Sequence, residues 1–225
     1  MFIINADDYG HSERVNNAII HCFNKRLIDS ATLMANMPGT EHAIKNNDNF
    51  SLGCHLNLME GKPLNSNCLN YRELTDSNGE LNLNLSRNSF FANKCIINQI
   101  KIELDHQISF LFDHKIKLTH LDSHHHTHTI PIIYRIVHEL ALKYKLRIRL
   151  PRYTGSHKLH KVLYKKILCI YMKKNGLNFT DKFINYNEMD SFKNNKEMIE
   201  VMVHPDLKDN NTIYCNTTNL IIDRL

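Results

Sequence analysis

Short apolar runs alternate with segments of helical period along most of this chain, and that order leaves few folds open to it. The apolar runs predict strands at residues 2–6, 31–35, 52–58, 116–122, 146–150 and 199–203. Apolar residues at helical spacing predict helices after Ser12, near 41–46, and at 97–111, 132–144 and 159–170. A strand-then-helix order favours an α/β fold with a parallel sheet, either closed into a barrel or open. We expect a single domain over residues 1–225.

Two stretches depart from this alternation. The polar stretch 65–88 has no clear period and is expected to be an insertion loop. Near the C-terminus, Pro205 is expected to end the last strand, and residues 218–225 are expected to begin a helix.

The bulk composition is that of an ordinary globular enzyme. With 42% hydrophobic and 23% charged residues, the chain can bury a core without disulfides. The formal charge of +5 is modest and no basic recognition helix is evident, so nucleic acid is not an expected partner. No apolar run has membrane-spanning length, and no signal peptide is evident. The six cysteines form no C-x-x-C pair, which predicts reduced thiols in a cytoplasmic protein.

Polar residues gather where the predicted strands end, which is where parallel α/β folds build their sites. The first group, at residues 5–10, contains the adjacent carboxylates Asp7 and Asp8. Successive side chains of a strand alternate in direction, so one acid can bind a metal while the other faces substrate or water. A helix-capping aspartate in a turn closed by Gly10 is the structural alternative.

Histidine dominates a later group. The chain has 15 His, and five of them lie between His120 and His128. On an extended chain His120, Asp122, His124 and His126 would share one face. Packing so many imidazoles together is costly unless they bind metal, substrate or carboxylates, and Asp122 could receive an imidazole N–H and fix its tautomer. A solvated His-rich loop is the alternative.

Two further groups each offer one histidine. Alternation places His55 and Asn57 on one face of the 52–58 strand, and His204 closes the 199–203 strand. Either histidine alone could simply be held by hydrogen bonds within the core. Together the four groups supply an aspartate, two or three histidines, a spare carboxylate and a spare histidine. These are the metal ligands and proton-transfer groups that a mononuclear metal hydrolase requires.

At these residues the sequence resembles the YdjC-like carbohydrate deacetylases, which include the chitooligosaccharide deacetylases. The family's motifs occur in order as N-A-D-D-[FY]-G at 5–10, G-x-H-x-x-L at 53–58, G-K-P-L at 61–64, T-H-L-D-S-H-H-H-x-H at 119–128 and E-V-M-x-H-P at 200–205. The His-rich motif is highly specific. The resemblance implies a distorted β/α barrel related to the polysaccharide deacetylase fold. It also implies removal of the N-acetyl group from an amino sugar or chitooligosaccharide.

The resemblance further implies one divalent metal ion. Its ligands would be Asp8, His55 and His124, and Asp7 would deprotonate the metal-bound water that attacks the acetyl carbonyl. Two imidazoles and one carboxylate favour Zn²⁺, although members of the family are often described with Mg²⁺.

The remaining motif residues are assigned to proton transfer and to contacts around the metal or substrate. His204 is the first candidate for the acid that protonates the departing amine, with His126 or His128 as alternatives. One of Arg147, Arg149 and Arg152 is expected to contact the substrate or the oxyanion. The residues assigned to contacts around the metal or with the substrate are Asp122, His126, His128, Asn57, Arg149 and Tyr9.

Two features depart from the family pattern. Members usually continue well past the H-P motif, whereas here 20 residues follow Pro205, so the barrel is expected to be incomplete at its C-terminal end. The chain has no Trp, so stacking on a sugar falls to Tyr or Phe, for example Tyr9. The resemblance also allows a homo-oligomer.

Two other functions compete with a deacetylase. A metal-dependent phosphoesterase or amidohydrolase would also use an H-x-H pair such as His124 and His126, although usually on the first strand. A catalytically impaired relative that binds metal or carbohydrate is the other, and the short C-terminal part motivates it.

Overall fold

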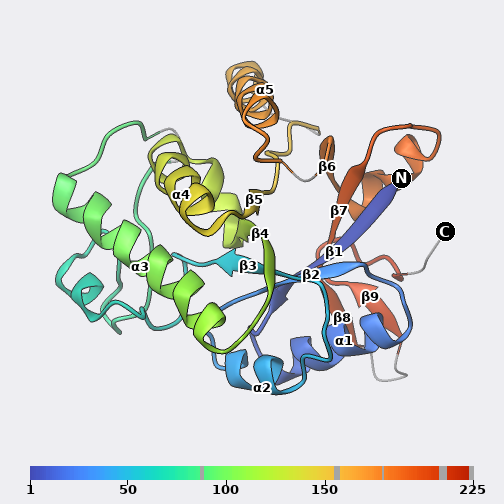
Figure 1. Ribbon diagram of the computed structural model, residues 1–225, viewed down its shortest axis with the longest axis horizontal. Helices are drawn as coiled ribbons and strands as arrows, with labels where there is room; N and C mark the ends of the chain where they lie inside the picture. Colours follow the sequence, from blue (N-terminus) through green and yellow to red (C-terminus); the bar gives the residue numbers. More distant parts are fainter. Residues whose placement is uncertain (87–88, 155–157, 179, 208–211, 223–225) are drawn as a thin grey trace.

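Seven parallel strands form the central sheet of the computed structural model, which describes residues 1–86, 89–154, 158–178, 180–207 and 212–222. The sheet curls into a half-barrel with the order β5-β4-β3-β2-β1-β7-β6 (Figure 1). Its strands are β1 (Phe2–Tyr9), β2 (Ser30–Leu33), β3 (Leu52–Leu56), β4 (Leu118–Ser123), β5 (Arg147–Ile148), β6 (Lys182–Asn185) and β7 (Ile199–Val203). All neighbouring strands pair in parallel. The expected α/β fold, a distorted β/α barrel with a parallel sheet, is confirmed in the form of this half-barrel.

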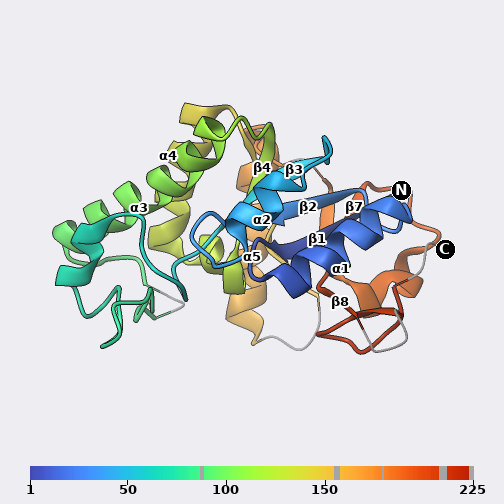
Figure 2. The ribbon, with the colours of Figure 1, turned by 90° about the horizontal axis from the view of Figure 1, so that it is seen from below.

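Helices cover the outside of this sheet. They are α1 (Glu13–Asn24), α2 (Thr40–Lys45), α3 (Lys94–Asp113), α4 (Pro131–Tyr144) and α5 (Leu159–Lys174). Three short 3-10 helices lie in the connections: η1 (Ser66–Asn70), η2 (His124–Thr129) and η3 (Tyr186–Phe192). Figures 1 and 2 show α3 beside α4, and α1 with α2 along another part of the sheet. Within the described residues, no helix combines the length and apolar character needed to cross a membrane.

Local signals explain where two of these helices begin. Ser12 is extended and its hydroxyl accepts a hydrogen bond from the Val15 backbone N–H at 3.3 Å, which caps α1 as its sequence predicts. Pro131 lies in the first turn of α4, where its missing N–H costs nothing. Because α1 follows β1 closely and α4 follows β4 through the short η2, both caps lie close to the strand ends that build the site.

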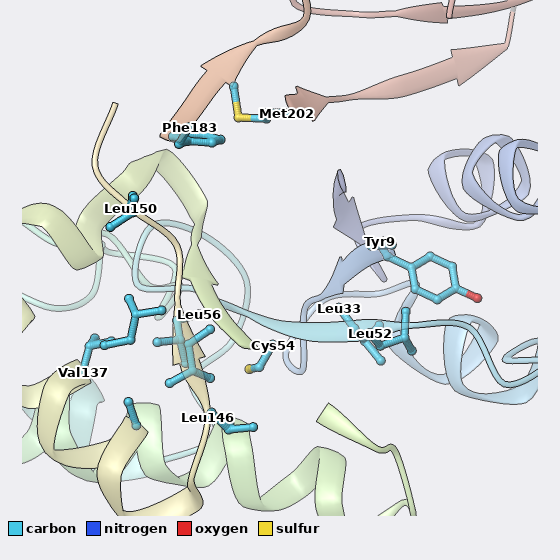
Figure 3. Close-up of a cluster of buried hydrophobic side chains, with 14 of the residues drawn as sticks. Tyr9, Leu33, Leu52, Cys54, Leu56, Val137, Leu146, Leu150, Phe183 and Met202 are labelled. Atoms are coloured by element: carbon cyan, nitrogen blue, oxygen red, sulfur yellow. The ribbon is translucent and has the colours of Figure 1, made fainter. Parts of the chain in front are cut away.

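The apolar core lies between the outer face of the sheet and the helices. On β3, Cys54 and Leu56 alternate with His55, and both pack in the buried cluster with Val137 of α4 (Figure 3). His55 points the opposite way, toward the inside of the curled sheet, where it meets Asp122. The two-residue period of β3 thus separates an apolar outer side from a polar inner side.

The structure corrects several of the expected elements. Residues 182–185 form β6, which the sequence analysis missed, and β5 is shorter than expected. β7 ends at Val203 as predicted, but Pro205 begins a further strand, β8 (Pro205–Leu207), which pairs antiparallel with β9 (Ile213–Cys215). The predicted helix at 218–225 is wrong for residues 218–222, which form a turn and an isolated bridge between Tyr214 and Ile221. The rest of that prediction lies outside the described residues.

The stretch 65–88 is irregular, as predicted, although two local structures give it shape. It contains η1 and one isolated bridge between Thr75 and Leu81, and residues 87–88 lie outside the description. Buried Glu103 of α3 anchors its start, because the Glu103 carboxylate accepts hydrogen bonds from the backbone N–H groups of Leu64 (3.2 Å) and Asn65 (2.6 Å).

Candidate active site

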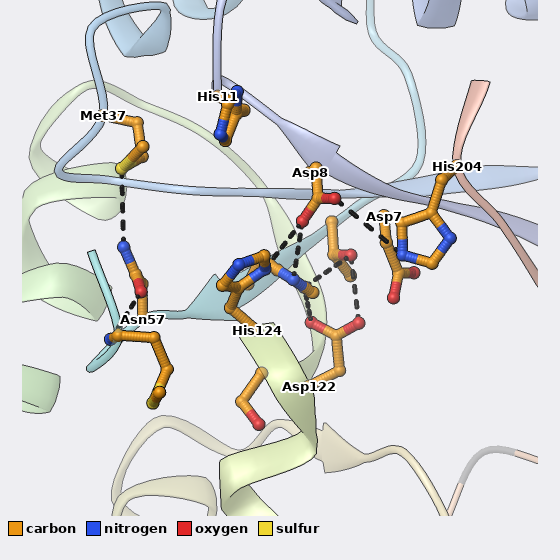
Figure 4. Close-up of polar contacts among 12 residues, drawn as sticks. Asp7, Asp8, His11, Met37, Asn57, Asp122, His124 and His204 are labelled. Atoms are coloured by element: carbon orange, nitrogen blue, oxygen red, sulfur yellow. Dashed lines mark hydrogen bonds and ion pairs between the residues drawn. The ribbon is translucent and has the colours of Figure 1, made fainter. Parts of the chain in front are cut away.

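The polar strand ends meet in one cavity of about 480 Å³ at the carboxyl end of the sheet. Asp7 and Asp8 come from β1, His55 from β3, His124 from η2 directly after β4, and His204 from the residue after β7. Figure 4 shows Asp8, His124 and His204 converging on this cavity. The sequence analysis expected these residues to meet because parallel strands end at the same edge.

Asp8, His55 and His124 form a group that could hold a metal ion. Their candidate ligand atoms all lie within 4.8 Å of one another. Asp8 Oδ1 is 3.2 Å from His55 Nε2 and 3.0 Å from His124 Nδ1. Burial would raise the pKa of the Asp8 carboxyl, but hydrogen bonds with His124 and His55 outweigh it and hold this pKa well below its usual range. Asp8 therefore stays an anion, as a metal ligand must.

The backbone separates the two adjacent aspartates. Asp8 has a left-handed backbone (φ 67), and the register between β1 and β2 shifts between Ala6 and Tyr9. An irregularity of this kind re-aims a side chain at the end of a strand. Gly10 then turns the chain with φ 91, where an added Cβ would lie 2.8 Å from the Met34 carbonyl oxygen. The result is that Asp7 and Asp8 reach the cavity from different directions (Figure 4).

A second carboxylate fixes the ring of His55. Asp122 Oδ1 is 2.7 Å from His55 Nδ1, and the two residues are register partners on β3 and β4. With Nδ1 bound to Asp122, Nε2 is the ring nitrogen that faces Asp8. Burial favours the neutral ring, but the charge and hydrogen bond of Asp122 and the hydrogen bond of Asp8 raise the pKa of His55 to about 10. Asp122 thus has the position that the sequence analysis expected for a residue that orients an imidazole.

His124 has a matching partner that the sequence analysis missed. Glu60 Oε1 is 3.0 Å from His124 Nε2, on the side of the ring away from Asp8. The Glu60 backbone is held by buried Asn57, whose side-chain amide donates to the Glu60 carbonyl at 2.8 Å and whose Oδ1 accepts from Met59 N–H at 2.9 Å. Asn57 therefore shapes the turn behind the cavity. Glu60 directly precedes Gly61 of the G-K-P-L motif, and that adjacency is the one signal that could have indicated it.

Asp7 is held by the buried Arg149. The Arg149 guanidinium donates to Asp7 Oδ1 and Oδ2, both at 2.7 Å, and Asn5 donates to Oδ1 at 3.0 Å. The same guanidinium lies 2.7 Å from Asp122 and 2.6 Å from Glu200. Arg149 is completely buried and does not line the cavity. Its position behind Asp7 is that of a buried cation that orients acids.

The C-terminal hairpin surrounds His204. Its Nε2 lies 3.8 Å from Asp8 Oδ2, and its Nδ1 is 3.3 Å from the Thr217 hydroxyl. The His204 backbone N–H donates to Cys215 Sγ at 3.4 Å. Burial would lower the pKa of His204, but the hydrogen bond with Cys215 and the charges of Asp7 and Asp8 raise it. His204 can therefore carry a proton at the edge of the cavity.

With this geometry in place, comparison with known proteins settles the family. A family model described as "YdjC-like protein" matches residues 1–222. The chain belongs to the YdjC-like family. The family that the sequence motifs resemble is thereby confirmed.

Relatives of this YdjC-like protein carry the name carbohydrate deacetylase. One from Clostridium beijerinckii is 32% identical over 218 residues, which cover 92% of this chain and 82% of the relative. Another, from Geobacillus stearothermophilus, is 37% identical over 160 residues, which cover 70% of this chain and 62% of the relative. A solved structure from Enterococcus faecalis V583, proposed to be a cellobiose-phosphate cleavage protein, is similar in fold with a TM-score of 0.71 and 20% identity. That match covers 93% of this chain and 82% of the other.

The remaining histidines of the YdjC-like motif do not share one face. The chain leaves the extended conformation after Ser123, and His125 and His126 have φ values of 53 and 54. His126 lines the cavity, whereas His128 is buried beneath it with its Nδ1 2.6 Å from the Ser123 hydroxyl. Burial lowers the pKa of His128 to about 3 and holds that of His126 well below its usual range. Both rings are neutral at physiological pH.

Two residues of the motifs lie away from the cavity. His120 packs inside the sheet against Gly53, where an added Cβ would lie 2.7 Å from the imidazole. Tyr9 is fully buried and its hydroxyl donates to the Ala43 carbonyl oxygen of α2 at 3.0 Å. Figure 3 shows the Tyr9 ring among the core side chains. The expectation that Tyr9 stacks on a sugar is wrong, because the irregular backbone at Asp8 breaks the strand alternation and turns this ring outward under α2.

The other two arginines near β5 have partners outside the cavity. Arg147 donates to the Asn178 carbonyl oxygen at 2.8 Å, and Arg152 Nη1 lies 3.4 Å from Glu188 Oε2. Neither lines the cavity.

Proposed function

We propose that this protein is a metal-dependent carbohydrate deacetylase that hydrolyses the N-acetyl group of an amino sugar or chitooligosaccharide. One observation carries the proposal: Asp8, His55 and His124 place three ligand atoms within 4.8 Å of one another, in a cavity that Asp7 and His204 also line. The names of its relatives in the YdjC-like family support a carbohydrate substrate.

The donor set fits a divalent metal. His55 has its Nδ1 occupied by Asp122, so its Nε2 would be the ligand atom once the metal displaces its proton, and Asp8 is an anion. A metal held by Asp8, His55 and His124 would polarise the acetyl carbonyl and make a neighbouring water more acidic. Two imidazoles in a set of three favour Zn²⁺, and Mg²⁺ is the second choice because it prefers oxygen ligands.

Asp7 is the proposed general base. Its Oδ1 accepts hydrogen bonds from both Arg149 and Asn5, whereas Oδ2 accepts one from Arg149. A carboxylate oxygen has two lone-pair sites, so Oδ2 keeps one for the proton of an attacking water. Arg149 holds this carboxylate in a fixed orientation, which is what efficient proton transfer requires.

His204 is the proposed general acid. It lies at the edge of the cavity, and Asp7 and Asp8 favour its charged form despite burial. Thr217 contacts Nδ1, which leaves Nε2 facing the cavity to protonate the departing amine nitrogen. His126 and His128 are less suited because burial keeps both rings neutral.

The geometry gives less support to a phosphoesterase or amidohydrolase built on an H-x-H pair. That function would need His124 and His126 to act together as ligands. Here His124 groups with Asp8 and His55 instead, and the left-handed backbone at His125 and His126 turns the chain directly after His124.

The test is acetate release from N-acetylglucosamine oligomers by the chelated protein reloaded with Zn²⁺, Mg²⁺, Mn²⁺ or Co²⁺. We expect metal-dependent release, loss of metal binding in His124→Ala, and an unchanged rate in the control His106→Ala on the exposed side of α3. Asp7→Asn should keep the metal but lower the rate by about 10²- to 10⁴-fold. The assignment of the two aspartates fails if Asp7→Asn abolishes metal binding while Asp8→Asn leaves it intact.

A further inference from the structure

A second cavity of about 480 Å³ lies between α4 and α5, outside the candidate active site. Aromatic rings form its walls: Phe90 lies before α3, Tyr134 and His138 are on α4, and Tyr164 and Tyr171 are on α5. The candidate active site uses none of these five residues. The volume is within the range of about 300–1,000 Å³ that is typical of small-molecule sites.

One buried hydroxyl in this cavity has no hydrogen-bond partner among the described residues. Tyr134 is 8% exposed, and its hydroxyl makes no hydrogen bond within the described part of the chain. Burial raises the pKa of this phenol, so the group remains a neutral hydroxyl that can both donate and accept. Buried polar groups are nearly always hydrogen-bonded, because leaving one unpaired is costly. A ligand hydroxyl in the cavity would satisfy Tyr134.

The ring arrangement leaves flat apolar surface available. Tyr134 and Tyr171 meet edge to face with centroids 6.3 Å apart, and His138 lies about equally far from both, at 6.0 and 5.9 Å. On the α5 side, Tyr171 is 46% exposed and Ile167 is 57% exposed. These side chains are not packed into the core, so their surfaces can cover a ligand.

The rim has both charges. Arg135 and Glu139 lie one helical turn apart on α4 and both line the cavity, and the Glu139 carboxylate also accepts a hydrogen bond from Lys101 of α3. A lining with one cation and one anion does not select a charged ligand. It suits a neutral molecule with many hydroxyl groups, which can accept from the guanidinium and donate to the carboxylate.

The cavity is linked directly to the active-site segment. The Tyr164 hydroxyl donates to the carbonyl oxygen of Thr129 at 3.1 Å, and Thr129 is the last residue of η2. Pro131, two residues later, lines the cavity itself. The short stretch from His124 to Pro131 therefore has the metal-ligand group at one end and this cavity at the other.

We propose that the cavity between α4 and α5 binds a pyranose ring of the same sugar chain whose acetylated residue lies at Asp8, His55 and His124. A pyranose has one face of C–H groups, which packs on an aromatic ring, and hydroxyls around its edge, which reach Tyr134, Arg135 and Glu139. The inference rests on the proposed function, since that function supplies the sugar chain. It predicts that longer oligomers bind better than short ones.

The test separates binding from turnover. Binding of N-acetylglucosamine oligomers of two to six units to the chelated full-length protein is measured by calorimetry, and acetate release is measured with the metal-loaded protein. We expect wild-type affinity to rise with chain length. Tyr171→Ala, at a half-exposed position, should weaken binding of the longest oligomer at least 10-fold, and Tyr134→Phe should weaken it by a smaller factor. Both should leave kcat/KM for the shortest substrate unchanged.

Leu142→Ala is the matched control, because Leu142 is a 57% exposed apolar residue of α4 that does not line the cavity. It should bind every oligomer as the wild type does. The proposal is overturned if Tyr171→Ala keeps wild-type affinity for all lengths, or if it lowers activity on all lengths equally. Length-dependent binding without acetate release from any substrate would support the cavity while contradicting the deacetylase, so the two proposals fail separately.

Discussion

Each of the two candidate imidazole ligands lies between two carboxylates. His55 contacts Asp8 through Nε2 and Asp122 through Nδ1, and His124 contacts Asp8 through Nδ1 and Glu60 through Nε2. In each case one carboxylate, that of Asp8, belongs to the candidate metal-ligand group, and the other orients the imidazole ring. Such outer partners orient the imidazole and raise its basicity. The two outer partners differ in burial, since Asp122 is inside the sheet and Glu60 is at the rim.

This arrangement predicts a specific effect of Glu60→Gln. The amide keeps the shape of the side chain but removes the charge that stabilises the Nε2 proton of His124. Metal affinity should fall about 10- to 100-fold, as is usual when an outer carboxylate is lost. Calorimetric titration of the chelated protein with Zn²⁺ measures it. Glu73→Gln, at an exposed position in the irregular 65–88 stretch, is the control and should titrate like the wild type. Equal Zn²⁺ affinities for Glu60→Gln and the wild type would show that Glu60 does not contribute to metal binding.

At the scale of elements, the β8–β9 hairpin places Thr217 beside His204. An ion pair between Asp206 and Arg14 holds the hairpin against α1. Asp206 of β8 accepts from Arg14 Nε at 2.8 Å, from the Tyr214 hydroxyl at 3.1 Å and from the Leu207 backbone N–H at 2.8 Å. Burial would raise the pKa of Asp206, but these hydrogen bonds lower it. The hairpin therefore depends on an ionised carboxylate.

Asp206→Asn should lower the free energy of unfolding by about 1 kcal/mol at pH 7, the usual size for a partly exposed charged hydrogen bond. Because the folded-state pKa lies below the ordinary value of 3.8, this stabilisation is present above that value and is lost as the pH falls through the folded pKa. The difference between variant and wild type should therefore shrink in acid. Urea unfolding at pH 7 and pH 3 measures this difference in stability.

Asp190→Asn is the control, because the Asp190 side chain is 81% exposed, and it should change stability little at either pH. A stability difference for Asp206→Asn that does not depend on pH would contradict the proposed role of the ionised carboxylate.

Elements with a strong period were predictable from the sequence, and those that depend on pairing were not. β1, β3 and β7 were indicated by apolar runs, and Asp122 could be expected to orient an imidazole, although its register pairing with His55 was not predicted. β6 was missed because Lys182–Asn185 has only two apolar residues, and β8 because a proline was taken to end a strand. Proline is in fact compatible with the first position of a strand.

The same limit applies within the site. Glu60 lies in a turn, beyond the reach of strand periodicity, and becomes a neighbour of His124 only through the hydrogen bonds of Asn57. Tyr9 follows Asp8 in an apparently site-forming motif, but the irregular backbone at Asp8 decides that its ring turns outward. Such local departures from regular geometry have no clear sequence signal.

At the scale of the whole molecule, a buried cluster of ionisable side chains connects several strands on the inner side of the sheet. Arg149 follows β5 and contacts Asp7 of β1, Asp122 of β4 and Glu200 of β7. One guanidinium thus connects chain segments that span the sheet from β7 to β5. Burial raises the pKa of Glu200 to about 8, and the charges of Asp122 and Asp7 add to this while Arg149 opposes it. The inner side of the half-barrel therefore depends on the Arg149 guanidinium, and the orientation of the proposed base depends on it too.

Arg149→Met should lower the free energy of unfolding by about 3–5 kcal/mol at pH 7, because it leaves the carboxylates of Asp7 and Asp122 buried without their cation. That is a large part of the total of about 5–15 kcal/mol typical of a folded protein. Buried carboxylates without a cation bind protons more readily in the folded state, so the loss should become smaller as the pH falls toward 4. Guanidinium unfolding of the chelated protein between pH 4 and 8 measures both effects. Arg149→Lys is the matched variant, since it keeps the charge but cannot make the paired contacts with Asp7, and it should recover part of the stability. A loss for Arg149→Met that stays constant over this pH range would mean that packing, and not the buried charges, sets the contribution of Arg149.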